Sequence, residues 1–328
     1  MTKERQEELL KMLTSADFND ATYEGLTAEE TIILCNSAKN MAEKNAEQEK
    51  VAFFFGKREE YFRHLVNLRM QKLEEMFVVF SKATNLPFVY CDPDSCNDQI
   101  WLFTSENLAK RCVIEQQKEK NELLLVKLLN KDFLGFYMSL FNMGVNELVV
   151  DRGGNTINIE LTSLVRMPDM KDVPEEKQPI KNAELVLTCA YFAQELRKPV
   201  EDKEAGIPQE RRETLKELEE EMLVNFKRGK FILPVILPEN ADQETKLTAK
   251  DIRIPFIKIG NGDAYQPICT DIGEFKKFNR DGKLKGLNVP FDKLPAMIAK
   301  DVKGLMLNPG SLRMAFPRVR LTGKAEEA

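Results

Sequence analysis

Two cysteines and three aspartates within eight residues form the densest group of potential ligands in the sequence. The segment 91–98 contains Cys91 and Cys96, with Asp92 and Asp94 between them. Thiolates and carboxylates bind divalent cations, and the aspartate spacing matches part of a calcium loop. The segment lacks the glycine and the late glutamate of such a loop, and no second close cysteine pair completes a zinc site. A polar hairpin turn is expected, with a metal-dependent or other enzymatic site as the alternative.

His64 is the only histidine in the chain. It lies in a stretch of apolar residues at helical spacing, where a packing or surface position is the ordinary role. One histidine cannot serve two copies of a domain, and metal sites that need two histidines from this chain are excluded. Schemes of the Ser-His-Asp or Cys-His type lose support for the same reason. No catalytic residue, metal ligand or cofactor is therefore assigned.

Two hydroxyl-containing segments lie where a predicted strand leads into a predicted helix. They are Thr104-Ser105-Glu106 and Thr270-Asp271. A side-chain oxygen at such a position caps the helix by accepting from its first free backbone N–H groups. The same N–H groups can instead bind an anion or a carboxylate. Capping is the expected role, because every helix start has donors to satisfy whereas few bind ligands.

If a ligand or partner binds, these strand ends are where we expect the contact. Loops at the ends of strands commonly carry function. The turns Asp151-Arg152-Gly153 and Asn308-Pro309-Gly310 are expected beside them. The candidate binding residues are Thr104, Ser105, Thr270, Asp271 and Asn308.

The remaining motifs favour structural roles. The glycine-containing turns match neither Gly-x-Gly-x-x-Gly nor the phosphate-binding Gly-x4-Gly-Lys-Ser/Thr loop. The acidic segment 217–221 is expected to be a solvated helix face, with contact to a basic partner as the alternative. Trp101, Phe103 and Tyr265 lie in or beside predicted strands and are expected in the core. Exposed aromatic rings there would instead indicate a binding groove.

The spacing of apolar residues predicts the elements that position these groups. The first 50 residues predict short helices, one of them starting at Thr27, and 49–73 predicts a long amphipathic helix. Further helices are expected at 132–143, 182–196, 210–226 and 294–299. Strands are expected at 76–80, 87–90, 99–103, 123–128, 147–150, 156–161, 231–237, 252–259, 264–269 and 304–307.

The same short patterns occur in each half of the chain, in the same order. Thr104 corresponds to Thr270, 166 positions later, and Asp151 corresponds to Asn308, 157 positions later. The nine-residue difference predicts a loop insertion in the first copy near 113–122. A period this long indicates a duplicated domain, because solenoid repeats span roughly 20–50 residues.

Four motifs of the second copy also carry a family resemblance. They are Phe231-Ile232-Leu233-Pro234-Val235, Ile252-Arg253-Ile254-Pro255-Phe256, Tyr-x-Pro-x-x-Thr-Asp at 265–271 and Leu307-Asn308-Pro309-Gly310. In this order they resemble the SseB N-terminal domain, named for a bacterial protein linked to enhanced serine sensitivity. The resemblance covers 223–317 and, more weakly, 77–168, where Asp151-Arg152-Gly153 replaces the family's Asn-Pro-Gly. It implies a fold and brings no established reaction.

Composition narrows the class of protein further. A chain of 328 residues with 43% hydrophobic and 31% charged residues is expected to form two ordinary globular domains. A net charge of −5 argues against general nucleic-acid binding. The apolar runs are shorter than the ~20 residues of a membrane span, and no apolar core follows the charged start, so a cytoplasmic location is expected. The six cysteines are expected to be reduced.

These observations predict an α/β (α+β) protein with two similar domains, each a mixed sheet flanked by helices. The expected segments are an N-terminal helical segment 1–48, a first, degenerate SseB-like domain 49–197, a linker 198–209 and a second SseB-like domain 210–328. We expect a non-enzymatic binding or regulatory module with a protein partner or a small ligand, and neither nucleic acid nor membrane. The alternatives are an enzyme that uses the segment 91–98 and a secretion-associated protein.

Overall fold

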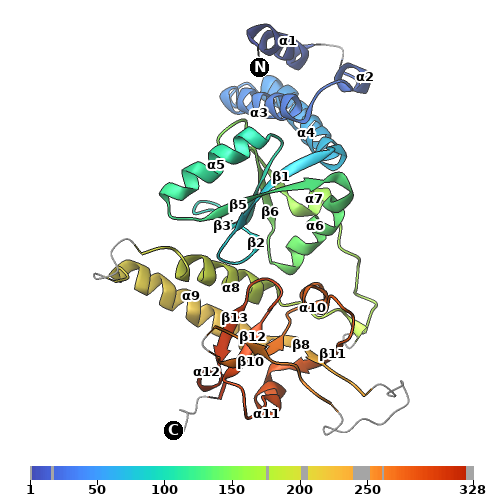
Figure 1. Cartoon of the computed structure of the whole chain (residues 1–328). Helices are drawn as coiled ribbons and strands as arrows, with labels where there is room; N and C mark the ends of the chain where they lie inside the picture. The colour runs from blue at the N-terminus through green and yellow to red at the C-terminus, as the bar shows by residue number, and fades with distance from the viewer. Residues whose placement is uncertain are drawn as a thin grey trace.

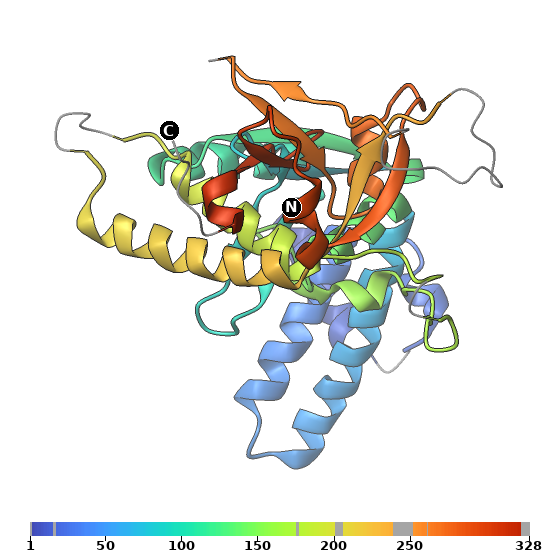
Figure 2. The same cartoon turned by 90° about the horizontal axis from the view of Figure 1, so that it is seen from below.

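The helices that open the chain lie at one end of the molecule (Figure 1). The computed structural model describes residues 2–15, 18–174, 177–200, 206–238, 252–260 and 262–322. Its first helices are α1 (Lys3–Thr14), α2 (Asp20–Tyr23), α3 (Ala28–Lys44) and α4 (Glu49–Lys72). The predicted helix start at Thr27 is confirmed, because its hydroxyl accepts from the Glu30 N–H while the Glu30 carboxylate accepts from the Thr27 N–H. Helices α3 and α4 pack together as a hairpin that projects from the body of the molecule (Figure 2).

A mixed sheet of seven strands forms the first domain. Its elements are β1 (Glu75–Ser81), β2 (Leu86–Pro87), β3 (Val89–Cys91), β4 (Asp98–Phe103), α5 (Glu106–Lys118), β5 (Leu123–Leu129), α6 (Asn130–Asn142), β6 (Glu147–Val150), β7 (Ile157–Glu160) and α7 (Leu161–Leu164). Strand β1 runs antiparallel to β2, β4 and β5. Strands β4 and β6 are parallel, with Leu102 opposite Val150, and β7 returns antiparallel to β6.

The second domain repeats this plan with shorter elements. They are β8 (Lys230–Val235), β9 (Ile257–Lys258), β10 (Ala264–Ile268), α10 (Ile272–Phe278), β11 (Lys285–Pro290), η2 (Phe291–Lys293), α11 (Leu294–Met297), β12 (Gly304–Leu307), β13 (Met314–Pro317) and α12 (Arg318–Thr322). Strands β13, β12, β10 and β9 form one sheet, and β8 with β11 forms a two-stranded sheet beside it. Reciprocal backbone bonds of 2.9 Å between Ile232 and Cys269 connect the two sheets.

Both domains have the same connectivity. The antiparallel pairs β1–β5, β3–β4 and β6–β7 correspond to β8–β11, β9–β10 and β12–β13. The parallel pair β4–β6 corresponds to β10–β12, and a helix follows the first strand of each pair. The predicted class, α/β with two similar mixed sheets flanked by helices, is confirmed.

Helices α8 (Ala183–Leu196) and α9 (Gln209–Arg228) lie between the two domains (Figure 1). They pack along each other, and α8 also contacts β3 and α6 of the first domain. Apolar residues of α8, including the fully buried Cys189, Ala190 and Ala193, belong to a hydrophobic core that extends from the N-terminal helices into the second domain. Helix α8 therefore packs into a core that the two domains share. The predicted linker 198–209 lies partly outside the described residues.

The nine extra residues of the first copy are not one insertion near 113–122. Strand β5 begins 19 residues after Thr104, whereas β11 begins 15 residues after Thr270. The other five residues lie between the start of β5 and Asp151, where the 13-residue α6 replaces the short η2 and α11. The difference is therefore divided between two crossings, each of which has a longer helix in the first copy.

Three strand predictions for the second copy were wrong or incomplete. Strands β11 and β13 were missed, because β11 contains glycine and proline and buries only Val289 fully, and β13 has only four residues. The predicted strand 252–259 is reduced among the described residues to β9 and a single bridge between Arg253 and Ile236.

Candidate functional site

The predicted site residues Thr104 and Ser105, together with Asp151 of the turn expected beside them, form what we call the first strand-end cluster. The carboxylate of Asp151 accepts from the Thr104 N–H at 2.8 Å and from the Thr104 hydroxyl at 2.7 Å. Asp151 is 1% exposed and has a positive φ of 54°. Burial raises the pKa of this carboxyl, and the two bonds from Thr104 act in the opposite direction. The cluster connects the end of β4 to the end of the parallel strand β6.

The second group, Thr270, Asp271 and Asn308, forms the second strand-end cluster with equivalent geometry. The side-chain oxygen of Asn308 accepts from the Thr270 N–H at 2.9 Å, and its amide nitrogen donates to the Thr270 hydroxyl at 2.9 Å. That hydroxyl donates to the Asp271 carboxylate at 2.8 Å. Thr270 and Asn308 are both 0% exposed, and Asn308 has a positive φ of 47°. This cluster connects the ends of β10 and β12.

The predicted capping role is confirmed in one cluster and wrong in the other. Asp271 begins α10, and its Oδ1 accepts from the N–H groups of Gly273 at 2.8 Å and Glu274 at 3.1 Å. Ser105 occupies the same position before α5 but makes no side-chain capping bond. Thr104 and Thr270 direct their hydroxyls to the neighbouring strand end instead. The Thr104 and Thr270 hydroxyls, with Asp151 and Asn308, therefore mainly hold the ends of neighbouring parallel strands together.

Neither Thr104 nor Thr270 lines one of the larger hollows that the described residues form. Asp271 borders a cavity of about 260 Å³ beside α6 and α8. Residues that follow the clusters in the sequence line larger hollows. Arg152 follows Asp151, and Ser311 and Arg313 lie in the turn after Asn308. These three side chains line a cleft between the first domain and the helices that join the domains.

We call this hollow the interdomain cleft, and its larger part the apolar compartment. The apolar compartment has a volume of about 790 Å³. Its walls come from β3, from the end of α5 and from α8 and α9. Its apolar side chains are Phe88, Val89, Tyr90, Leu187 and Leu218, and its charged side chains are Asp98, Glu119, Arg152, Glu195, Lys198 and Glu221.

Polar contacts fix the walls of the apolar compartment. The guanidinium of Arg152 lies over the ring of Trp101 at 4.1 Å and over that of Tyr90 at 5.1 Å. The hydroxyl of Tyr191 donates to Asp98 at 2.7 Å, which connects α8 to the start of β4. Burial and the bond to Asp98 raise the pKa of Tyr191, so this phenol stays protonated at neutral pH.

Gln194 attaches α8 to the open edge of strand β3. Its Nε2 donates to the Val89 carbonyl at 2.9 Å, and its Oε1 accepts from the Val89 N–H at 3.1 Å. The side chain therefore satisfies both backbone groups of one residue, as a neighbouring strand would. This contact was not foreseen, because the sequence contains no signal that joins positions 105 residues apart.

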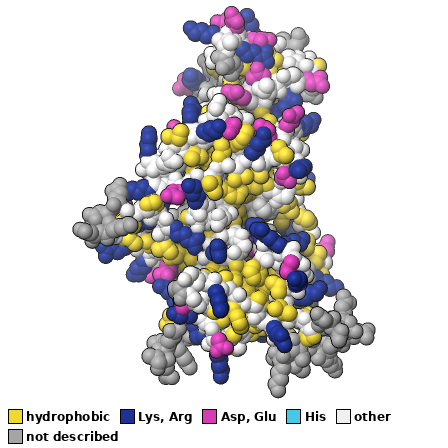
Figure 3. All heavy atoms as spheres, in the orientation of Figure 1, with side chains coloured by type: hydrophobic (Ala, Val, Ile, Leu, Met, Phe, Trp, Pro, Cys, Tyr) yellow, Lys and Arg dark blue, Asp and Glu magenta, His cyan; other side chains and the backbone are white. Residues whose placement is uncertain are grey.

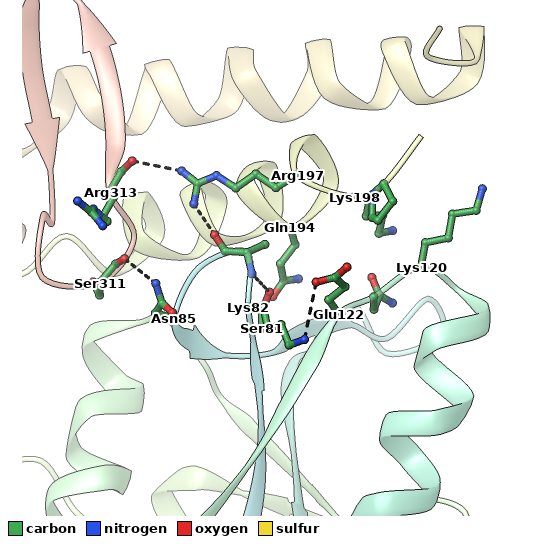
Figure 4. Close-up of a pocket in the computed structure, with 13 residues that line it drawn as sticks. Ser81, Lys82, Asn85, Lys120, Glu122, Gln194, Arg197, Lys198, Ser311 and Arg313 are labelled. Carbon is green, nitrogen blue, oxygen red and sulfur yellow. Dashed lines mark hydrogen bonds and ion pairs between the residues drawn. The ribbon is translucent and has the colours of Figure 1, made fainter. Parts of the chain in front are cut away.

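The smaller part of the cleft, the basic compartment, has a volume of about 340 Å³ (Figure 4). Arg197, at the end of α8, donates to the carbonyls of Ala83 in the first domain and of Leu312 and Arg313 in the second. Burial, and then the charge of Arg313, lower the pKa of Arg197. The two compartments share the lining residues Asn121, Gln194 and Lys198, so they adjoin each other.

The segment 91–98 is the hairpin turn between β3 and β4 and borders the cleft. Asp92 Oδ1 accepts from the N–H groups of Asp94 at 3.0 Å and Ser95 at 2.9 Å, and these bonds lower the pKa of Asp92. Partial burial, then the nearby Asp98, raises the pKa of the Cys91 thiol. Within the described residues, no group of three or more His, Cys, Asp and Glu is placed to bind a metal ion.

The other candidate residues have ordinary positions. Trp101, Phe103 and Tyr265 are buried, which confirms the core-packing prediction. His64 lies exposed on α4 in a hollow of the N-terminal helices, far in the sequence from the cleft residues. On the face drawn in Figure 3, lysine and arginine side chains occur along the whole molecule with Asp and Glu among them. The lining of the basic compartment, by contrast, has five Lys and Arg side chains and one carboxylate.

Among the described residues, none of the helices has both the length and the apolar character that crossing a bilayer requires. Comparisons with protein-family models, with curated proteins and with solved structures give no match for this chain.

Proposed function

We propose that this chain is a cytoplasmic, non-enzymatic binding or regulatory module of the SseB type, and that it takes a ligand or a partner in the interdomain cleft. The observation that carries this proposal is that two adjoining hollows are lined together by both domains and by α8 and α9. Binding sites are commonly concave, mostly apolar and found between domains, with a few convergent polar groups. The apolar compartment is concave, and its lining combines apolar side chains with six charged ones.

The way the domains are joined supports a regulatory role for this cleft. Arg197 bonds to backbone carbonyls of both domains, and Asn85 Nδ2 of the first domain donates to the Ser311 carbonyl at 3.4 Å. A ligand that contacts both walls would strengthen this connection, because it would bind only the arrangement in which the walls are close. Such a change in domain coupling is a signal that a partner protein can recognise.

The chemistry of the segment 91–98 favours binding over the enzymatic alternative. A nucleophilic cysteine needs a lowered pKa, and the pKa of Cys91 is raised instead. The Asp92 carboxylate is already bonded to two backbone N–H groups of its own turn. Elemental analysis of the purified protein tests the alternative directly. A stoichiometric metal that is lost in a Cys91→Ala, Cys96→Ala variant would favour the enzyme or metal-site hypothesis.

Two variants of α9 test the cleft itself. Glu221 lines the apolar compartment, whereas Glu217 on the same helix is exposed and does not. We expect Glu221→Trp to fill the compartment and Glu217→Trp to leave it open. Wild type and Glu217→Trp should recover the same proteins and small molecules from native lysate, identified by mass spectrometry, and Glu221→Trp should lose them. Equal recovery by all three folded proteins would reject the cleft as the binding site.

A further inference from the structure

We propose that the interdomain cleft binds a small phosphorylated molecule, with its phosphate in the basic compartment and its apolar or aromatic body in the apolar compartment. This inference rests on the proposed function, because it names the chemistry of a ligand for the same cleft.

The basic compartment combines cations from both domains and from α8. Lys82 comes from the β1–β2 turn, Lys120 from the α5–β5 loop and Arg313 from the β12–β13 turn, while Arg197 and Lys198 directly follow α8. The lining contains five cationic side chains and one carboxylate, Glu122, and Lys198 is also paired with the adjacent Glu195 at 2.7 Å. Glu122 is 3.9 Å from Lys82, a long ion pair between exposed groups. The chain as a whole has a net charge of −5, so this excess of positive charge is a local feature.

The bonds of Arg197 leave its charge in the compartment uncompensated. Its guanidinium donates to the neutral carbonyls of Ala83, Leu312 and Arg313. Carbonyls satisfy donors, but only an anion balances the charge. The negative end of the α8 dipole is partly offset, because Arg211 Nη2 donates to the carbonyls of Glu195 at 2.5 Å and Lys198 at 2.9 Å. An anion at this place would be attracted to Arg197, to Arg313 and to the three lysines of the lining.

The adjoining compartment determines what the rest of the ligand must be. Phe88, Tyr90, Leu187 and Leu218 provide apolar surface, and the acidic Asp98, Glu119 and Glu221 make this end unfavourable for a second anion. Lys198 lines both compartments, so it lies where a phosphate would join an apolar body. A volume of about 340 Å³ accommodates a phosphate group, and one of about 790 Å³ accommodates a ring system.

Isothermal titration calorimetry at low ionic strength with four small probes tests whether the ligand is divided between the two compartments in this way. The probes are phenyl phosphate, inorganic phosphate, benzoate and phenol. We expect phenyl phosphate to bind at least tenfold more tightly than any of the other three, because only it supplies a dianion and a ring together. Benzoate affinity equal to that of phenyl phosphate would overturn the assignment of a phosphate.

Matched lysine variants test where the anion binds. The double variant Lys82→Gln, Lys198→Gln removes two positive charges from the cleft. Lys82 has a carboxylate neighbour at 3.9 Å, and Lys198 has one at 2.7 Å. Lys216→Gln, Lys283→Gln removes two exposed lysines outside the cleft that also have carboxylate neighbours, at 3.8 Å and 3.5 Å. The first variant should weaken phenyl phosphate binding at least tenfold and the second should not. Equal affinities in the two variants would overturn the proposal.

The Glu221→Trp variant separates the two compartments and the two proposals. It should lose the advantage of phenyl phosphate over inorganic phosphate while inorganic phosphate still binds. If no phosphate probe binds the wild type, the phosphate inference is wrong. The cleft would then remain the binding site as long as Glu221→Trp still loses the molecules that wild type recovers from lysate.

Discussion

Asp151 and Asn308 occupy the same position in the two domains, and each fixes a threonine at the end of the neighbouring parallel strand. Both have left-handed backbone conformations, and both donate their N–H groups at 2.9 Å to the backbone carbonyls of Leu102 and Ile268, respectively. One is an acid and the other an amide, and the residue after each threonine explains the difference.

Each strand-end cluster contains one carboxylate. In the second cluster the Thr270 hydroxyl donates to Asp271, so the third residue must donate a proton to that hydroxyl, and the amide of Asn308 does so. In the first cluster Ser105 takes the place of Asp271, so the Thr104 hydroxyl is free to donate to the carboxylate of Asp151. The residue types at these three positions therefore depend on one another, because each hydrogen-bond donor needs an acceptor.

Asp151→Asn should raise stability at neutral pH, because removing the buried charge should outweigh the acceptor that the Thr104 hydroxyl loses. The pKa of Asp151 is raised in the folded protein, which means that the folded state binds this proton more tightly than the unfolded state. Its ionisation therefore costs stability as the pH rises from about 4, the unfolded pKa of Asp. Urea unfolding should show the largest gain for the variant near pH 7 and a shrinking gain towards pH 4. A variant that is less stable than wild type at pH 7 would contradict this account.

Asn308→Asp should be strongly destabilising, although Asp is the residue that the first cluster has at the equivalent position. It would place a second carboxylate against Asp271, with one hydroxyl between them and both positions almost fully buried. We expect a loss of about 2–4 kcal/mol in the free energy of unfolding at pH 7. Protonation should relieve part of the loss in acid. Adding Asp271→Ser, which reproduces the arrangement of the first cluster, should recover stability, and an unchanged loss in that double variant would reject the explanation.

Gln194→Ala should release strand β3 from α8. The variant removes two buried hydrogen bonds with Val89, so we expect a loss of about 1–3 kcal/mol. Hydrogen exchange should accelerate at the Val89 amide. Gln209→Ala, which removes an exposed bond to Glu213, is the matched control and should change stability by less than about 0.5 kcal/mol. Unchanged exchange at Val89 would show that the edge of β3 is protected by something else.

The strand-end residues themselves remain candidates for partner contact, and a Thr104→Ala, Thr270→Ala variant tests them. Thr270 is 0% exposed and bonded through its hydroxyl, so we expect a loss of about 1–3 kcal/mol from its substitution. If these residues only fix strand ends, the variant should recover the same partners from native lysate as wild type, compared at equal folded fraction. Loss of a partner by this variant, with the partner kept by Glu221→Trp, would move the site from the cleft to the strand ends.

The sequence alone predicted the class of fold, because the signals for it are local. Apolar spacing predicted α4 and the strands β1, β4, β6, β10 and β12, and the order of these elements indicated two similar domains. It also paired Thr104 with Thr270, and Asp151 with Asn308, as equivalent residues of the two copies. It failed at β11, whose glycine and proline oppose a strand, since pairing with β8 and not local preference decides its conformation.

Only the tertiary structure decided how these residues are used. Thr104 and Thr270 have the residue type of helix caps, but their hydroxyls bond across to strands 47 and 38 residues later in the chain. The cleft depends on the same kind of contact, since Gln194 and Arg197 reach the first domain over more than 100 residues. A polar side chain can bond to many partners of the right polarity, and its partner is fixed only when packing of the apolar core brings distant segments together.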